Sequence, residues 1–229
     1  MIDVVYSPQW FYGKDIIIDI FSIFVLFLIG YSSLQFYRLK KNKKHAYLAL
    51  SFFFVGLSFL FKILTNFTIY YNVLETEHLG AFTFIHQEVE SSTILFFIGF
   101  LLYRILTLLG LYILYSTYQE QPKQHILFVA YLLLILTYFS TSAYYLFHIT
   151  SLFLLVLITS YYIKNYLKEK RISTKLLATS FGIISASQII FIFIEVNHIF
   201  YVIAELVQLI GYLILLITFI RVLKYDKKT

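Results

Sequence analysis

Long apolar segments follow one another along almost the whole chain, and this pattern constrains the fold more than any other feature. A helix that crosses a membrane needs about 20 mostly apolar residues, because each residue advances about 1.5 Å through a hydrocarbon layer about 30 Å thick. The sequence therefore predicts an all-α fold, a seven-transmembrane-helix bundle that forms a single membrane domain over residues 1–229. The predicted spans are residues 15–38, 46–71, 92–118, 125–143, 147–167, 174–195 and 198–223.

Positive charges gather in alternate gaps between these segments, whereas the other gaps carry acidic residues. Cytoplasmic loops of membrane proteins collect Lys and Arg, so we expect the N-terminus outside and the C-terminus in the cytoplasm of a cell-membrane protein. A six-span alternative would fuse the fourth and fifth spans or drop one of them, because 140–151 is a weak break. It would put the basic stretch 164–175 and the basic C-terminus on opposite sides, against the charge rule. The basic residues in question are Arg38, Lys40, Lys41, Lys43, Lys44, Lys123, Lys164, Lys168, Lys170, Arg171, Lys175, Arg221, Lys224, Lys227 and Lys228.

The composition excludes several classes of protein. Charged residues make up 13% of the chain and hydrophobic residues 60%, whereas a soluble domain carries about 25% charged residues. The net charge of +6 does not indicate nucleic-acid binding, because the basic residues are spread over membrane-edge loops and no nucleic-acid motif accompanies them. We expect the lipid bilayer as the main partner. The absence of Cys excludes disulfides, thiolate metal sites and cysteine nucleophiles.

Polar residues inside the predicted spans indicate where a functional site would lie. Charge at bilayer depth is costly and usually faces the interior of a bundle. At about 1.5 Å per residue, Asp19 lies about 5 Å, Lys62 about 6–8 Å, Glu205 about 9 Å and Arg104 about 16 Å below the outer membrane edge. Acids and bases of different helices therefore converge in the outer half of the membrane. The candidate residues for a ligand site or an ion-pair cluster are Asp19, Lys62, Asn66, Arg104, Glu195, Tyr201, Glu205 and Gln208.

Unpaired charges at this depth are unfavourable, so we expect ion pairs among these residues. The two expected pairs are Lys62 with Asp19 or Glu205, and Arg104 with Glu205 or Glu195. Two interpretations follow from this cluster. It either locks the helices together, or it lines a polar pocket that is open to the outside and holds a small polar or anionic ligand. The fourth and fifth spans have no ionisable residue at depth, so we expect them to face lipid more.

Metal and cofactor chemistry has weak support in the sequence. His78, His86, His148 and His198 are predicted outside the membrane and are the only zinc candidates, but no two of them share a helical face. We therefore expect neither a metal nor a cofactor. The seven-span plan and the Arg in the third span resemble microbial rhodopsins in architecture only. The only Lys of the seventh segment, Lys224, lies at its cytoplasmic end, which leaves Lys62 as a weaker candidate for a retinal Schiff base.

Three stretches of the chain resemble small archaeal seven-helix integral membrane proteins. They are SPQWFYGKD (7–15), FKILTNFTIYY (61–71) and FLLYRILTLLGLYILY (100–115), and the resemblance covers most of the chain. It implies a stand-alone seven-helix module and brings no activity or residue role with it.

Three local patterns complete the expected architecture. Residues 72–91 are predicted as an outer connector that lies over the bundle as a hairpin or short helix. Ala178, Gly182 and Ala186 recur every four residues, which predicts a close helix–helix seam. No internal repeat is evident, and both prolines lie outside the spans, which weighs against a carrier with broken helices.

The predicted function is a receptor-like or sensory module with an outward-facing polar pocket, whose output protein would bind the basic cytoplasmic loops. The alternative is a small-solute or proton-coupled carrier that uses Asp19, Lys62, Arg104 and Glu205. A membrane enzyme ranks third, because the sequence has no nucleophile–base pair or strong metal motif. A purely structural membrane component is also open, and the sequence does not predict an oligomeric state.

Overall fold

The computed structural model describes residues 7–78, 85–118, 123–139 and 144–226, and within these ranges it contains helices and turns but no strands. The all-α prediction is therefore confirmed for this part of the chain. A short 3₁₀ helix, Gln9–Phe11, comes before the first long helix. The long helices are α1 (Lys14–Lys40), α2 (Lys43–His78), α3 (Ile85–Tyr118), α4 (Lys123–Phe139), α5 (Tyr144–Glu169), α6 (Ile172–Ile192) and α7 (Ile199–Asp226).

Six of these helices are long and apolar enough to cross a membrane, judged by length and composition over the described residues. Their outward faces carry large hydrophobic side chains such as Ile17, Phe24 and Phe153. The chain is therefore a multi-pass membrane protein whose helices contact the lipid bilayer. α4 has 17 residues, which span about 26 Å, and it is not one of the six. The seventh span and the orientation stay predictions.

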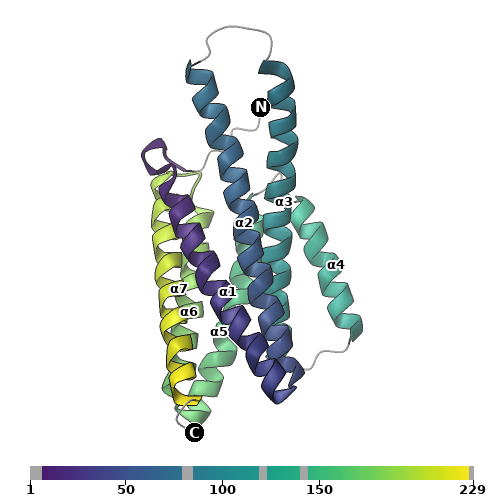
Figure 1. Cartoon of the computed structure of the whole chain (residues 1–229), viewed down its shortest axis with the longest axis vertical. Helices are drawn as coiled ribbons and strands as arrows, with labels where there is room; N and C mark the ends of the chain where they lie inside the picture. The colour runs from purple at the N-terminus through teal and green to yellow at the C-terminus, as the bar shows by residue number, and fades with distance from the viewer. Residues whose placement is uncertain (1–6, 79–84, 119–122, 140–143, 227–229) are drawn as a thin grey trace.

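The predicted connector at 72–91 is largely helical. α2 continues to His78 and α3 begins at Ile85, so that these helices have 36 and 34 residues. Figure 1 shows them projecting beyond the other helices at the top of the bundle. The segments 72–78 and 85–91 contain no Gly or Pro to end a helix, and this explains why both helices continue.

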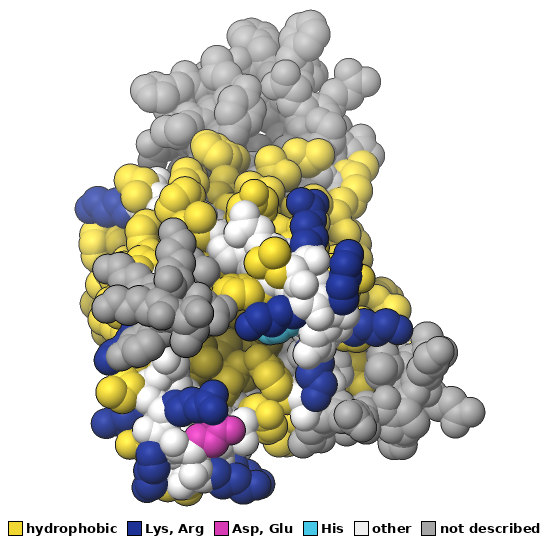
Figure 2. Space-filling model, turned by 60° about the horizontal axis from the view of Figure 1, so that its bottom comes forward, with side chains coloured by type: hydrophobic (Ala, Val, Ile, Leu, Met, Phe, Trp, Pro, Cys, Tyr) yellow, Lys and Arg dark blue, Asp and Glu magenta, His cyan; other side chains and the backbone are white. Residues whose placement is uncertain are grey.

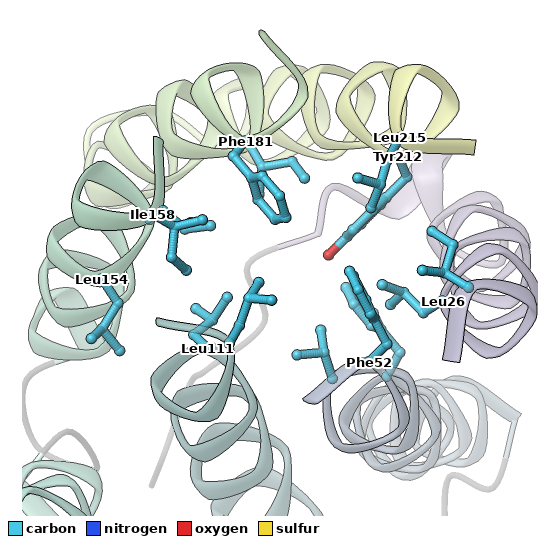
Figure 3. Packing of buried hydrophobic residues seen from close by; sticks show 14 of the residues in the cluster. Leu26, Phe52, Leu111, Leu154, Ile158, Phe181, Tyr212 and Leu215 are labelled. Carbon is cyan, nitrogen blue, oxygen red and sulfur yellow. The ribbon is translucent and has the colours of Figure 1, made fainter. Parts of the chain in front are cut away.

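Six helices form a closed ring in the order α1, α2, α3, α5, α6, α7, with α7 packed against α1. α4 lies outside this ring against α3 and α5. The prediction that the fifth span faces lipid is wrong, because Leu154, Leu155 and Ile158 of α5 are buried in the core. Figure 3 shows large side chains from the ring helices, Phe52 and Phe181 among them, directed into its centre.

Two tight turns close the same end of the bundle. α1 ends at Lys41, whose φ is 53° and whose N–H donates to the carbonyl of Tyr37 at 2.8 Å. α5 ends in the same way at Lys170, whose φ is 54° and whose N–H donates to the carbonyl of Tyr166 at 2.8 Å. The exposed Lys and Arg residues of 38–44 and 164–175 lie around these turns, and we call this end the basic end.

The contacts between neighbouring helices also recur. Ser51 of α2 donates to the carbonyl of Gly110 of α3 at 2.8 Å, and Ser180 of α6 donates to the carbonyl of Gly211 of α7 at 2.9 Å. Glycine is needed at both acceptors. A Cβ atom added at Gly110 would lie 2.6 Å from the side chain of Val55 in α2. A Cβ atom added at Gly211 would lie 2.5 Å from the side chain of Ile184 in α6.

These contacts reveal an internal repeat that the sequence analysis did not find. The turn residue Lys170 follows Lys41 by 129 residues, and the donor Ser180 follows Ser51 by the same 129. The acceptor Gly211 of α7 follows Gly110 of α3 by 101 residues. We call α1–α3 the first half and α5–α7 the second half. The predicted seam is corrected too, because Ala186 is exposed, and the backbones of neighbouring helices approach closely at Gly110 and Gly211 instead.

Candidate functional site: a buried charge cluster and a vestibule on one axis

Lys62 of α2 joins two acidic side chains from other helices. Its Nζ lies 2.8 Å from Oδ1 of Asp19 in α1 and 2.5 Å from Oε1 of Glu205 in α7. We call these three residues the charge cluster. Asp19 and Glu205 are 0% exposed and Lys62 is 9% exposed. The sequence predicted that Lys62 would pair with one of these acids, and the structure brings it to both.

The charge cluster has an excess of acceptors. Oδ2 of Asp19 and Oε2 of Glu205 are buried and have no hydrogen-bond partner among the described residues. A buried acceptor without a donor is unfavourable, and such groups in proteins usually call for an explanation. The two free oxygens can accept a proton or a donor group of a ligand without breaking either ion pair. The prediction placed these residues around an open pocket, whereas here they are buried.

A second polar layer lies at the N-terminal turn of α1. Asp15 is 0% exposed, and its Oδ2 accepts hydrogen bonds from Asn66 at 3.1 Å and from the hydroxyl of Tyr201 at 3.5 Å. A carboxylate in the first turn also interacts favourably with the helix dipole. Outside the spans, partial burial and the charge of Asp15 raise the pKa of Tyr12. Asn66 and Tyr201 thus contact Asp15, which was not among the predicted site residues.

Arg104 of α3 is buried, with 3% of its surface exposed. Its guanidinium carbon lies 3.7 Å from the ring centroid of Phe100 and 5.3 Å from that of Phe147 in α5, distances typical of cation–π contacts. Glu195 is exposed in the turn after α6. The pairing of Arg104 with Glu205 or Glu195 stays a prediction. Gln208 is buried and donates to the hydroxyl of Tyr212 at 3.4 Å.

His148 does not lie outside the membrane bundle as predicted. α5 begins at Tyr144, before the predicted start of this span, and the helix carries His148 into the interior. Its Nδ1 hydrogen-bonds Oε1 of Gln188 at 2.9 Å, and its ring stacks on Phe191 with centroids 4.9 Å apart.

Of the other zinc candidates, only His198 has a side chain that the structure describes. His198 is exposed, and His78 and His86 lie in α2 and α3 where side chains are not described. No three potential metal ligands come together in the part of the chain that the structure describes.

A cavity of about 350 Å³, which we call the vestibule, opens at the basic end of the ring. All six ring helices line it, and Lys40 and His45 belong to its wall at this end. Inside it, the hydroxyl of Tyr162 donates to that of Tyr118 at 2.6 Å. Figure 2 shows apolar side chains in a hollow between the basic side chains of this end. Sequence reasoning missed the vestibule because its walls are apolar and look like ordinary core.

Between the vestibule and the charge cluster, large hydrophobic side chains fill the ring around a void of only about 20 Å³, which is room for about one water molecule. We call this set the plug, and part of it is drawn in Figure 3. Its members are Leu26, Phe52, Val55, Leu111, Leu114, Leu155, Phe181, Ile184, Tyr212 and Leu215.

The vestibule, the plug and the charge cluster follow one another along the axis of the ring. Phe52 and Leu215 of the plug also line the vestibule. On the other side, the ring of Tyr212 contacts Phe59, and Nζ of Lys62 lies 5.5 Å from the centroid of Phe59. Along each helix, a member of the charge cluster is seven residues, or about 10 Å, from a plug residue.

No protein-family model, curated protein or solved structure matches the chain. The resemblance to archaeal seven-helix proteins therefore stays a prediction, and the function has to be argued from the geometry.

Proposed function

We propose that this membrane protein is a carrier that moves a small polar or anionic solute together with protons, with the charge cluster as its coupling site. The observation that carries this proposal is the arrangement along one axis. An open vestibule at the basic end leads to a thin hydrophobic plug, and the buried charge cluster lies directly beyond it. Carriers place their sites between structural repeats near the middle of the membrane, and here the cluster joins the two halves of the ring.

The chemistry of the charge cluster fits proton coupling. Two carboxylates share one ammonium group, and each keeps one oxygen without a partner among the described residues. A proton that binds to Oε2 of Glu205 removes the charge that holds Lys62, and its release restores the ion pair. The carboxylate takes the proton from hydronium and later returns it to water, so the only bond that forms and breaks on the protein is the O–H bond of Glu205. The basic residues around the vestibule attract an anionic solute to its mouth.

The receptor-like interpretation has less support than the carrier. It needs a pocket open at the end opposite to the basic residues, whereas the charge cluster is buried and the vestibule opens at the basic end. Tight binding of a solute without transport would nevertheless favour a receptor. An enzyme has less support, because the amine of Lys62 is held in two ion pairs and the described residues bring no group of three potential metal ligands together.

We also propose that α4 is the seventh span and that the N-terminus lies outside. α3 and α5 run in the same direction, so α4 has to return the chain across the bundle between them (Figure 1). The basic stretches 38–44 and 164–175 lie at one end, as the positive-inside rule requires. In intact cells, the Val196→Cys variant should react with an impermeant thiol reagent, and the Lys43→Cys variant should not. The opposite result would reverse the orientation.

Proton flux into proteoliposomes tests the carrier directly. Vesicles that contain a pH-sensitive dye and the purified protein receive a pH step, alone and with a panel of small carboxylates and amino acids. We expect solute-dependent proton flux that the Glu205→Gln variant abolishes, because this side chain keeps its size but loses its charge. The matched control is Glu169→Gln, which changes an exposed acid outside the candidate site and should transport normally. Vesicles without flux for the whole panel, or equal flux in both variants, would refute the proposal.

A further inference from the structure

Equivalent positions in the two halves make equivalent contacts at the level of the charge cluster. Asp19 and Lys62 of the first half correspond to His148 and Phe191 of the second half, 129 residues later. Both pairs are in contact. Asp19 and Lys62 form an ion pair at 2.8 Å, and the rings of His148 and Phe191 stack at 4.9 Å between centroids. The packing between the two helices is thus the same in each half, while the chemistry has changed from an ion pair to stacked rings.

The charged residues that cross between the halves are also equivalent. Glu205 follows Arg104 by 101 residues. Glu205 reaches from the second half to Lys62 of the first half at 2.5 Å. Arg104 belongs to the first half and lies 5.3 Å from the ring centroid of Phe147 in the second half. Each half therefore sends one charged side chain toward the other half, at the two places where the halves meet.

The plug consists entirely of such equivalent pairs. Leu26 pairs with Leu155 and Phe52 with Phe181 at the spacing of 129 residues, and Leu114 pairs with Leu215 at the spacing of 101. The remaining members pair in the same way. Each pair takes one side chain from each half, and Figure 3 shows labelled members directed toward a common centre. The plug therefore lies where the two halves meet and depends on how they are placed.

The junctions between the halves are looser than the packing within them. α2 packs extensively against α1 and α3, and α6 packs extensively against α5 and α7. The junctions between α1 and α7 and between α3 and α5 contain far fewer contacts. A limited interface between two well-packed units favours movement of one unit relative to the other. Within the first half, the ion pair between Asp19 and Lys62 would stay intact during such a movement.

We propose that the plug is a gate that opens when the two halves move relative to each other, and that the Lys62–Glu205 ion pair is the latch that holds it closed. This inference rests on the proposed carrier function and identifies its moving parts. In this structure the vestibule is open, the plug is closed and the charge cluster is buried. Neutralisation of Glu205 releases the only ion pair of the cluster that joins the halves, and the separating halves then connect the cluster with the vestibule.

Single cysteines can test the gate, because the natural chain contains none. The Leu48→Cys and Leu177→Cys variants report on the vestibule from equivalent positions in the two halves. The Ser58→Cys and Ser187→Cys variants report on the space beyond the plug, where both serines are 0% exposed. Each variant is treated in detergent micelles with a charged methanethiosulfonate reagent. The rate of reaction is then compared with and without the additional Glu205→Gln substitution.

We expect the vestibule cysteines to react quickly in both backgrounds. The cysteines at 58 and 187 should react slowly in the natural background and about tenfold faster or more with Glu205→Gln, since a charge-assisted hydrogen bond has been lost. Glu169→Gln, which changes an exposed acid, should leave the reaction rates unchanged. Thr137→Cys reports on general loosening, because this residue is buried in α4 outside the ring and should stay protected.

Two results would overturn the gate. One is a reaction rate at 58 and 187 that Glu205→Gln does not change. The other is an equal increase at 137, which would mean that the whole bundle has loosened. Proton flux in the same variants separates the two proposals. Gate opening in a protein without flux for any solute would retain the moving junction and refute the carrier, whereas flux with a permanently protected plug would refute the gate alone.

Discussion

Replacement of Lys62 by Met removes the cation that forms ion pairs with Asp19 and Glu205. Met keeps most of the apolar volume of the side chain, so packing against Phe59 is largely preserved. The two carboxylates stay buried without a counter-charge. At an effective dielectric constant of about 20, contacts of 2.8 and 2.5 Å each contribute about 6–7 kcal/mol of attraction.

Most of that attraction offsets the cost of removing the charges from water. The net loss when one partner of a buried ion pair is removed is about 3–5 kcal/mol. We therefore expect the free energy of unfolding of Lys62→Met to fall by about 3–5 kcal/mol. The measurement is an SDS titration of the protein in mixed micelles. The control is Lys164→Met, which removes an exposed lysine near the basic end and should change stability little.

A triple variant separates charge from packing. Asp19→Asn, Lys62→Met and Glu205→Gln together remove every charge of the cluster, and replacement of a whole buried ion network by neutral groups is often close to neutral. We expect the triple variant to lie within about 1 kcal/mol of the natural chain. A triple variant as unstable as Lys62→Met alone, or a single variant as stable as the natural protein, would refute the electrostatic account of the cluster.

Three further predictions concern the packing of the ring. Gly110→Ala and Gly211→Ala should each destabilise the protein by about 1–3 kcal/mol, because the new Cβ lies 2.6 or 2.5 Å from a neighbouring side chain. Gly182→Ala should leave the free energy of unfolding unchanged, since the new Cβ would lie 3.7 Å from its nearest neighbour, an ordinary van der Waals distance. Tyr118→Phe and Tyr162→Phe should each cost about 1 kcal/mol, and the double variant no more than either, because they share one hydrogen bond. Gln188→Leu should cost about 1–3 kcal/mol by leaving the buried ring of His148 without its partner. Unfolding in mixed micelles measures all of these, and additive losses in the tyrosine pair or a loss at Gly182 equal to that at Gly110 would contradict the contacts described.

The sequence predicted the helices well because length and apolar composition are local properties. All seven predicted spans coincide with helices, with ends that differ by a few residues in most cases. The ends of α2 and α3 that project beyond the other helices were the exception, because polar residues without Gly or Pro can continue a helix beyond its apolar part. His148 was misplaced for a related reason, since the weak break before it shortened the predicted fifth span.

The candidate site was predictable in part. Helical spacing and depth placed Asp19, Lys62 and Glu205 at one level, and the cost of buried charge required them to pair. The sequence did not reveal that Lys62 would contact both acids, or that Asn66 and Tyr201 would contact Asp15. It also missed the internal repeat. Equivalent positions of the two halves carry different residue types at the charged sites. The equivalence of the halves becomes clear only from contacts such as those at Gly110 and Gly211.

The sequence alone determined that this chain is a helical membrane protein with charged residues at one depth, because span length, charge distribution and helical spacing are written along each segment. The tertiary structure decided the order of the helices in the ring, the partners of Lys62 and the existence of the vestibule. The physical reason lies in the spans themselves. They are apolar on almost every face, so no single helix specifies its neighbours. The ring forms through contacts between different helices, from 31 positions apart for Ser180 and Gly211 to 143 positions apart for Lys62 and Glu205.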